Sequence, residues 1–127
     1  MTRDKLIKNI AWAISLMEGF HEEGSVARKH NNPGNLRTWG KHPVVGGFVQ
    51  FPTVADGWTA LERQVGRNID RGLNLLEFFG GKPGVYAGYA PAADKNNPDK
   101  YAKFVAGRVG VEVDKKLLDV IEEDGNV

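Results

Sequence analysis

Residues 10–20 of the chain read IAWAISLMEGF, and this stretch determines the first helix of the expected fold. Its apolar residues follow the spacing of an amphipathic helix, which we expect to begin after Thr2 and to stop at Gly19. Glu18 falls on the apolar stripe at the end of that helix. The stretch therefore predicts a buried helix face that carries one acidic side chain.

A glutamate on a buried helix face needs a physical reason, because burying an ionised carboxylate costs far more than leaving it in water. Desolvation by the stripe and the negative end of the helix dipole would both raise the pKa of Glu18. A rise from about 4.3 to about 6 needs only about 2 kcal/mol, and it gives an acid that can protonate a glycosidic oxygen. The alternative is a surface ion pair of Glu18 with Arg28, Lys29 or Arg37 at a frayed helix end.

The next segment, from Gly24 to Gly47, is rich in Asn, Pro and Gly, and residues 31–35 read NNPGN. This composition favours turns over long helices. Two short strands, near residues 36–38 and 48–51, are expected to form a small hairpin joined by the loop from Gly40 to Gly47.

Capping signals predict the helices that follow. Thr53, with Asp56 three residues later, begins a second long helix that stops at Gly72. Asn74, with Glu77 at the third position, caps a short helix. The apolar stripe expected for the long helix is Val54, Trp58, Leu61, Val65 and Ile69.

The C-terminal part of the chain carries two more helix signals. Asn97 as cap and Pro98 as first residue begin a helix, and a last helix follows Asp114. The apolar positions assigned to these two helices are Tyr101, Phe104, Val105, Val109, Leu117, Leu118 and Ile121.

Composition restricts the class of protein. A chain of 127 residues with 41% hydrophobic and 26% charged residues is expected to form one globular domain over residues 1–127, of the α+β class and mainly helical. The net charge is only +1, and the Lys and Arg residues form no basic stripe along the sequence. Nucleic acid is therefore not an expected partner. The longest apolar run, residues 10–17, is shorter than the roughly 20 residues of a membrane span.

Several classes of chemistry are excluded because the chain lacks the residues or motifs that they need. Cysteine is absent, which removes disulfides and thiolate nucleophiles. The run HEEGS at residues 21–25 has Ser25 where a zinc-protease helix needs its second histidine. Lys82 is followed by Pro83, which excludes a phosphate-binding loop. His30 and His42 are isolated in loops, and no metal or other cofactor is expected.

Three runs taken together, MEGF at residues 17–20, GSVAR at 24–28 and NNPGNLR at 31–37, resemble the lysozyme-like enzymes of phage particles and related bacterial lytic transglycosylases. The runs GFVQFP at 47–52 and ADGW at 55–58 look like that superfamily's second strand entering its central helix. The segment from Tyr89 to Pro91 and the run NPDKY at 97–101 look like its C-terminal part, so the resemblance spans roughly residues 10–110.

The resemblance implies a helical domain with a small hairpin flanking a cleft, and cleavage of the β-1,4 bond between N-acetylmuramic acid and N-acetylglucosamine. Glu18 would be the catalytic acid and, once deprotonated, the base that accepts the C6-hydroxyl proton of N-acetylmuramic acid. Tyr101 would be a second catalytic residue that reaches the acid or the substrate, and core packing is an equal alternative for it.

The substrate-binding residues expected from the resemblance and from the chemistry of sugar recognition are Asn35, Arg37, Trp39, Gln50 and Tyr89. Asn35 has the alternative of being a turn residue. Trp39, in a loop, is the better candidate for stacking on a sugar, whereas Trp58 lies on a buried stripe.

The chain departs from the transglycosylase pattern, which commonly has Gly-Leu-Met-Gln where residues 35–38 read NLRT. Gln50 is only a speculative substitute for that glutamine. A second carboxylate, as two-carboxylate glycosidases require, is also not evident. The candidates are Glu22, Glu23, Asp56 and Asp94. None of the four belongs to a clear motif, which favours an anhydro-forming, single-acid mechanism over hydrolysis. The alternative is a water-activating role for Glu22 or Glu23.

The expected partner is a peptidoglycan glycan strand, bound by a monomer that acts alone or within a phage particle. The N-terminus, MTRDKLIK, does not resemble a secretory leader, so delivery to the periplasm or cell wall by a phage particle or by lysis is expected, after residence in the host cytoplasm. The alternative function is a non-catalytic glycan-binding or virion structural module with a lysozyme-like fold.

Overall fold

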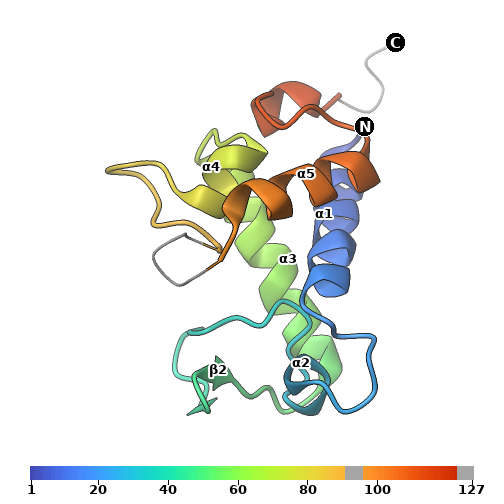
Figure 1. Ribbon diagram of the computed structural model, residues 1–127, viewed down its shortest axis with the longest axis vertical. Helices are drawn as coiled ribbons and strands as arrows, with labels where there is room; N and C mark the ends of the chain where they lie inside the picture. The colour runs from blue at the N-terminus through green and yellow to red at the C-terminus, as the bar shows by residue number, and fades with distance from the viewer. Residues whose placement is uncertain (91–95, 123–127) are drawn as a thin grey trace. The chain divides into compact units, whose positions relative to one another are not determined.

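The computed structural model describes residues 1–90 and 96–122 (Figure 1). These residues are mainly helical, with five α-helices, one 3-10 helix and a two-stranded antiparallel hairpin, which confirms the expected α+β, mainly helical class. The chain divides into two compact units, one of residues 1–10 with the chain from Gly66 onward and one of residues 11–65. The expectation of a single domain over residues 1–127 stays a prediction.

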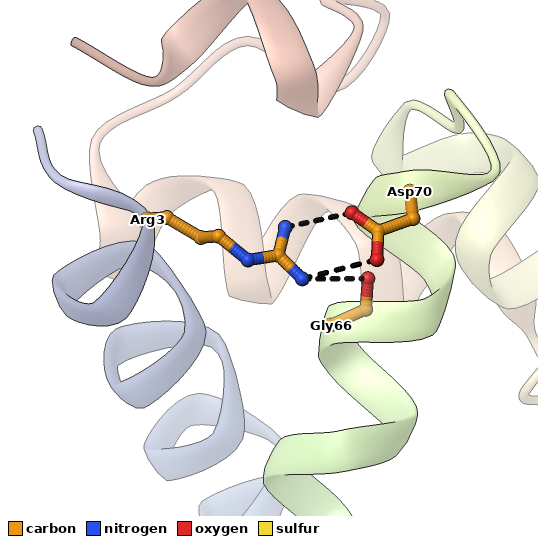
Figure 2. Close-up of polar contacts among 3 residues, drawn as sticks. All are labelled: Arg3, Gly66 and Asp70. Carbon is orange, nitrogen blue, oxygen red and sulfur yellow. Dashed lines mark hydrogen bonds and ion pairs between the residues drawn. The ribbon is translucent and has the colours of Figure 1, made fainter. Parts of the chain in front are cut away.

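The first unit contains the N-terminal part of α1 (Arg3–Met17), the C-terminal part of α3 (Val54–Asp70), α4 (Leu75–Gly80), α5 (Pro98–Val109) and the 3-10 helix η2 (Leu117–Val120). The guanidinium of Arg3 in α1 binds the carboxylate of Asp70 in α3, with N–O distances of 2.8 and 3.1 Å. It also donates to the carbonyl of Gly66 at 3.4 Å (Figure 2). This one side chain therefore joins the two helices within the unit.

The second unit contains the remainder of α1 and α3, the short helix α2 (Val26–Lys29), and the hairpin of β1 (Val44–Val45) and β2 (Phe48–Val49). The strands pair in register, with Val44 opposite Val49 and Val45 opposite Phe48. Both residues of β1 are exposed, whereas Val49 is fully buried. Only the second strand therefore contributes to the core.

Local capping explains where the helices begin. The backbone N–H of Asp56 donates to Thr53 Oγ1 at 3.1 Å, at the expected start of α3. Asn74 and Glu77 form the predicted reciprocal capping box at the start of α4. Asn97 caps α5 with Pro98 in its first turn. These three predictions are confirmed.

The helices α1 and α2 end in the same way, each followed by one residue with left-handed backbone. Gly19, after α1, has a φ of +70°, and Asn31, after α2, has a φ of +54°. After α1, Phe20 N–H donates to Ser15 O and Gly19 N–H donates to Leu16 O. This is the Schellman motif, which satisfies the last carbonyls of a helix.

Some expectations were wrong. Residues 36–38 form no strand, and the first strand of the hairpin lies at Val44–Val45, joined to β2 by the two glycines at 46 and 47. The last helix is a single 3-10 turn in which Leu117 is buried but Leu118 is 42% exposed. Phe104 and Val54 are also exposed, because each lies on the solvent side of its helix.

No helix among residues 1–90 and 96–122 combines the length and the apolar character that crossing a membrane requires.

Candidate functional site

Glu18 is the C-cap residue of α1, one position beyond the last helical residue, Met17. Its backbone N–H still donates to Ile14 O at 2.9 Å, so its place is fixed by the helix. Its side chain is half-buried rather than enclosed. The left-handed Gly19 then turns the chain away, which leaves the carboxylate at the end of the helix.

The carboxylate of Glu18 accepts a hydrogen bond from the side chain of Asn35, with 3.1 Å between Asn35 Nδ2 and Glu18 Oε2. Asn35 itself is half-buried and has a left-handed φ of +48°. The contact joins residues 17 positions apart. It brings together two of the runs that carry the sequence resemblance, MEGF at residues 17–20 and NNPGNLR at 31–37.

The loop that presents Asn35 is built around a buried asparagine, Asn32. Asn32 Oδ1 accepts from Leu36 N–H at 2.9 Å, and Asn32 Nδ2 donates to Leu36 O at 3.0 Å and to Val49 O at 2.9 Å. Asn35 N–H closes a turn onto Asn32 O at 3.0 Å. The Asn32 side chain thereby takes up the Leu36 N–H and the Val49 carbonyl. One backbone bond joins these two residues, from Val49 N–H to Leu36 O at 2.9 Å, and residues 36–38 form no ladder.

Gly57 in α3 supports this loop from the other side. A Cβ at Gly57 would lie 1.9 Å from Asn31 O and 2.8 Å from Pro33 Cδ. Only glycine lets the helix approach the NNPGN turn so closely. The ADGW run at residues 55–58 therefore has a packing reason that its sequence alone does not reveal.

Four aromatic rings form a closed cycle around the turn that follows Glu18. The rings of Trp12 and Trp58 are nearly parallel at 9°, with centroids 6.0 Å apart. Phe20 meets Trp58 edge-on at 5.6 Å and His21 edge-on at 5.2 Å, and His21 lies 4.5 Å from Trp12. Trp12 remains 48% exposed although it lies within α1. The cycle attaches residues 20 and 21 to α1 and to α3.

A hydrogen bond adds to this attachment. Ser15 is fully buried, and its hydroxyl donates to Trp12 O at 2.6 Å. Ser15 Oγ lies 2.9 Å from His21 Nε2, so the oxygen accepts the N–H of the imidazole. In this arrangement the histidine donates, whereas a base that activates a serine nucleophile must accept. The pair therefore holds the turn in place.

The other predicted substrate residues of this unit are spread along the loop and the hairpin. Arg37 is exposed, with its guanidinium carbon 5.2 Å from the centre of the Phe48 ring. Trp39 is half-buried, and its carbonyl accepts from His42 N–H in a turn. Gln50 is exposed, and its N–H donates to Pro43 O at 2.9 Å. Their roles toward a sugar stay predictions.

Tyr101 and Tyr89 belong to the first unit. Both are half-buried, and their rings lie against Phe79 with centroid distances of 5.5 and 5.9 Å. Tyr89 N–H also donates to Phe78 O at 2.8 Å. These ring contacts are typical of core packing, and the catalytic role of Tyr101 and the substrate role of Tyr89 stay predictions.

The candidate second carboxylates differ in their settings. The Glu22 carboxylate folds back over the turn, where a Cβ on Gly19 would lie 3.2 Å from Glu22 Oε2. All three described candidates, Glu22, Glu23 and Asp56, are exposed, the last in the first turn of α3. Asp94 lies outside the described residues. Glu22 is therefore the second acid that the fold brings to the turn beside Glu18.

A shallow pocket lies in the first unit, in the loop of residues 80–87 that is closed by the Lys82–Tyr86 bridge. Its lining contains no carboxylate. Within residues 1–90 and 96–122, no three histidine or acidic side chains lie close enough to hold a metal ion.

Sequence reasoning missed the roles of Asn32, Gly57 and His21. A buried asparagine before Pro33 and a glycine inside an amphipathic helix are the signals that were available. Neither signal names its partner, because each partner comes from another segment of the chain.

Comparison with protein-family models, with curated proteins and with solved structures gave no match to this chain.

Proposed function

We propose that the chain is a peptidoglycan-cleaving enzyme with a lysozyme-like fold, which acts on the β-1,4 bond between N-acetylmuramic acid and N-acetylglucosamine. The observation that carries the proposal is the hydrogen bond from Asn35 to Glu18. It joins the MEGF and NNPGNLR segments, whose resemblance to lysozyme-like enzymes rests on their residues alone and not on any contact between them.

The chemistry that we assign to Glu18 is that of an acid followed by a base. Its carboxyl proton passes to the glycosidic oxygen as the bond from that oxygen to C1 of N-acetylmuramic acid breaks. The resulting carboxylate takes the proton from the C6 hydroxyl, whose oxygen bonds to C1. The product is a 1,6-anhydro sugar, and no water is consumed. The half-buried C-cap position of Glu18, at the negative end of α1, supports an acid of this kind.

A lytic transglycosylase is favoured over a hydrolytic lysozyme because, among the carboxylates of residues 1–90 and 96–122, only Glu18 combines a helix-fixed backbone with the side-chain bond from Asn35 in the NNPGN loop. Glu22 is the residue to examine for hydrolysis, since its carboxylate lies over Gly19. In a hydrolytic enzyme it would activate a water molecule.

The test is the loss of turbidity of purified peptidoglycan, with wild-type protein, with Glu18→Gln and with Glu112→Gln as the matched control. Glu112 is an exposed glutamate outside the unit that contains Glu18. We expect wild type and Glu112→Gln to clear the suspension at equal rates and Glu18→Gln to be slower by at least about 100-fold. Equal activity of wild type and Glu18→Gln refutes the catalytic assignment.

Mass spectrometry of the released muropeptides separates the two reactions. Anhydro ends are expected for transglycosylation, and reducing ends indicate hydrolysis. Hydrolysis that depends on Glu22, tested with Glu22→Gln, would replace the single-acid mechanism by a two-carboxylate one. Binding of peptidoglycan without cleavage by either wild type or Glu18→Gln would favour the non-catalytic glycan-binding module.

A further inference from the structure

We propose that Asn35 is the positioning residue of Glu18: its amide N–H orients the carboxylate and stabilises the ionised form that is left after proton delivery. This inference deepens the proposed function and rests on it for its catalytic part. Its structural part, a preferential hydrogen bond to the Glu18 carboxylate, can be tested without any substrate.

The geometry is that of one donor aimed at one carboxylate oxygen. Asn35 Nδ2 lies 3.1 Å from Glu18 Oε2, and both residues are half-buried. An N–H group can only donate, so it binds an ionised carboxylate more strongly than the neutral acid. Burial has the opposite effect and favours the neutral acid. A group that must first lose and then regain a proton works best when neither form is strongly preferred.

The far side of the Asn35 amide is free of competing bonds. Asn35 Oδ1 is buried and has no hydrogen-bond partner among the described residues. A buried oxygen without a partner is costly, and folding accepts this cost in an asparagine whose other end reaches Glu18. Among the described residues, the Asn35 side chain is therefore hydrogen-bonded to Glu18 and not to the loop around it.

The loop itself is held by other groups. Asn32 makes three side-chain bonds to Leu36 and Val49, and its carbonyl accepts the backbone N–H of Asn35 at 3.0 Å. Removing the Asn35 side chain leaves all of these bonds in place. The effect of its removal on Glu18 can thus be separated from an effect on folding.

Because the backbone at residue 35 is left-handed, substitution by glycine can remove the Asn35 side chain without adding backbone strain. Glycine accepts the φ of +48° without the cost that alanine would have, so Asn35→Gly removes the amide alone. Asn31 offers the matched control, because it is also an asparagine with a left-handed φ, of +54°, and its amide binds the Phe51 carbonyl instead of Glu18.

The experiment is a 13C NMR titration of the Glu18 carboxyl group in wild type, Asn35→Gly, Asn31→Gly and Asn35→Asp. The signal is assigned by its absence in Glu18→Gln. We expect the midpoint to move to higher pH in Asn35→Gly, since the group that favours the ionised form is gone. It moves further in Asn35→Asp, where a second carboxylate faces the first. Asn31→Gly titrates as wild type does.

The catalytic part is read from the rate of peptidoglycan cleavage against pH. For Asn35→Gly we expect kcat to fall by about 10-fold to 100-fold with little change in KM. The alkaline limb of its profile should move to higher pH with the NMR midpoint. Asn31→Gly keeps the wild-type profile.

The outcomes distinguish the two proposals. An unchanged Glu18 midpoint in Asn35→Gly, or an equal shift in Asn31→Gly, overturns the role of Asn35 whether or not the protein cleaves peptidoglycan. A shifted midpoint in a protein with no lytic activity supports the hydrogen-bonding role and refutes the proposed function. A loss that appears in KM and not in kcat assigns Asn35 to substrate binding and overturns the positioning role.

Discussion

Asn35 donates its amide N–H to the carboxylate of Glu18 at 3.1 Å, although the two residues lie 17 positions apart, on either side of the short helix α2. Both ends of this bond depend on left-handed backbone, at Gly19 directly after the glutamate and at Asn35 itself. The contact is therefore a product of two local turn conformations, and a change in either turn should separate the acid from its partner.

Gly57→Ala is expected to be the most damaging of the small substitutions. The new methyl group would lie 1.9 Å from Asn31 O, and a backbone oxygen cannot move aside as a flexible side chain can. We expect a loss of about 3 kcal/mol or more in the free energy of unfolding, measured in urea.

The control for Gly57→Ala is Gly107→Ala in α5, where a Cβ meets nothing within 4 Å. Alanine should stabilise that helix by about 0.5 kcal/mol, because it has the higher helix propensity. A Gly57→Ala protein as stable as wild type would show that α3 does not press against the NNPGN turn.

Gly19→Ala tests the turn on the other side of the contact. Alanine at a φ of +70° should lower the free energy of unfolding by about 1 kcal/mol. Gly24→Ala is the matched control, with a φ of +77° and open space around it. Both variants should lose similar stability in urea, but only Gly19→Ala should lose peptidoglycan cleavage. Equal rates for the two would mean that Gly19 does not set the position of Glu18.

The parts of the fold that sequence could predict are those in which the signal and its partner are neighbours. The capping box of Asn74 and Glu77 needs only residues three positions apart, and the structure confirms it. The start of α5 at Asn97 and Pro98 is equally local. The end of α1 at the Gly19 turn follows the same logic.

The first strand of the hairpin was predicted at the wrong residues because strand pairing here depends on groups that are distant in the sequence. Leu36 looks like a strand residue, and its C=O accepts the backbone N–H of Val49 in β2. Its N–H is bound by the Asn32 side chain, which also binds the Val49 carbonyl. The first strand lies at Val44 and Val45, both exposed, so no alternation of buried and exposed residues marks it. The adjacent glycines at 46 and 47 were the better turn signal, since a two-residue glycine turn favours a hairpin.

For the candidate site, sequence singled out Glu18 and Asn35 separately. Their contact, and the support that Asn32 and Gly57 give to it, arise from packing between segments and have no local signal. Sequence could therefore single out the glutamate, whereas its hydrogen-bond partner required the structure.

The ion pair of Arg3 and Asp70 should contribute little to stability despite its two short bonds. Its side chains are 42% and 63% exposed, so water screens their attraction. A double-mutant cycle with Arg3→Gln and Asp70→Asn should give a coupling energy below about 1 kcal/mol, which decreases as salt is added. The Lys8–Asp4 pair, at 3.9 Å and more exposed, should couple less. A larger coupling that is insensitive to salt would contradict this account.

Tyr86 should make the stability of the protein depend on pH in the alkaline range. Burial raises the pKa of its phenol above the usual 10.0, and the hydrogen bond to Asn68 and the charge of Arg71 only partly offset this. The unfolded chain therefore loses the phenolic proton at a lower pH than the folded protein does. The stabilising contribution is complete below pH 10 and is lost as the pH rises through the pKa of the folded state.

The measurement is the free energy of unfolding of wild type and Tyr86→Phe from pH 8 to about pH 11. Phenylalanine keeps the ring, which lies 4.8 Å from the Arg71 guanidinium carbon, and removes the ionisable group. We expect the stability of wild type to fall more steeply above pH 10 than that of Tyr86→Phe. Parallel curves for the two proteins would show that the phenol ionises equally easily in the folded and unfolded chain, and would contradict the burial of its hydroxyl group.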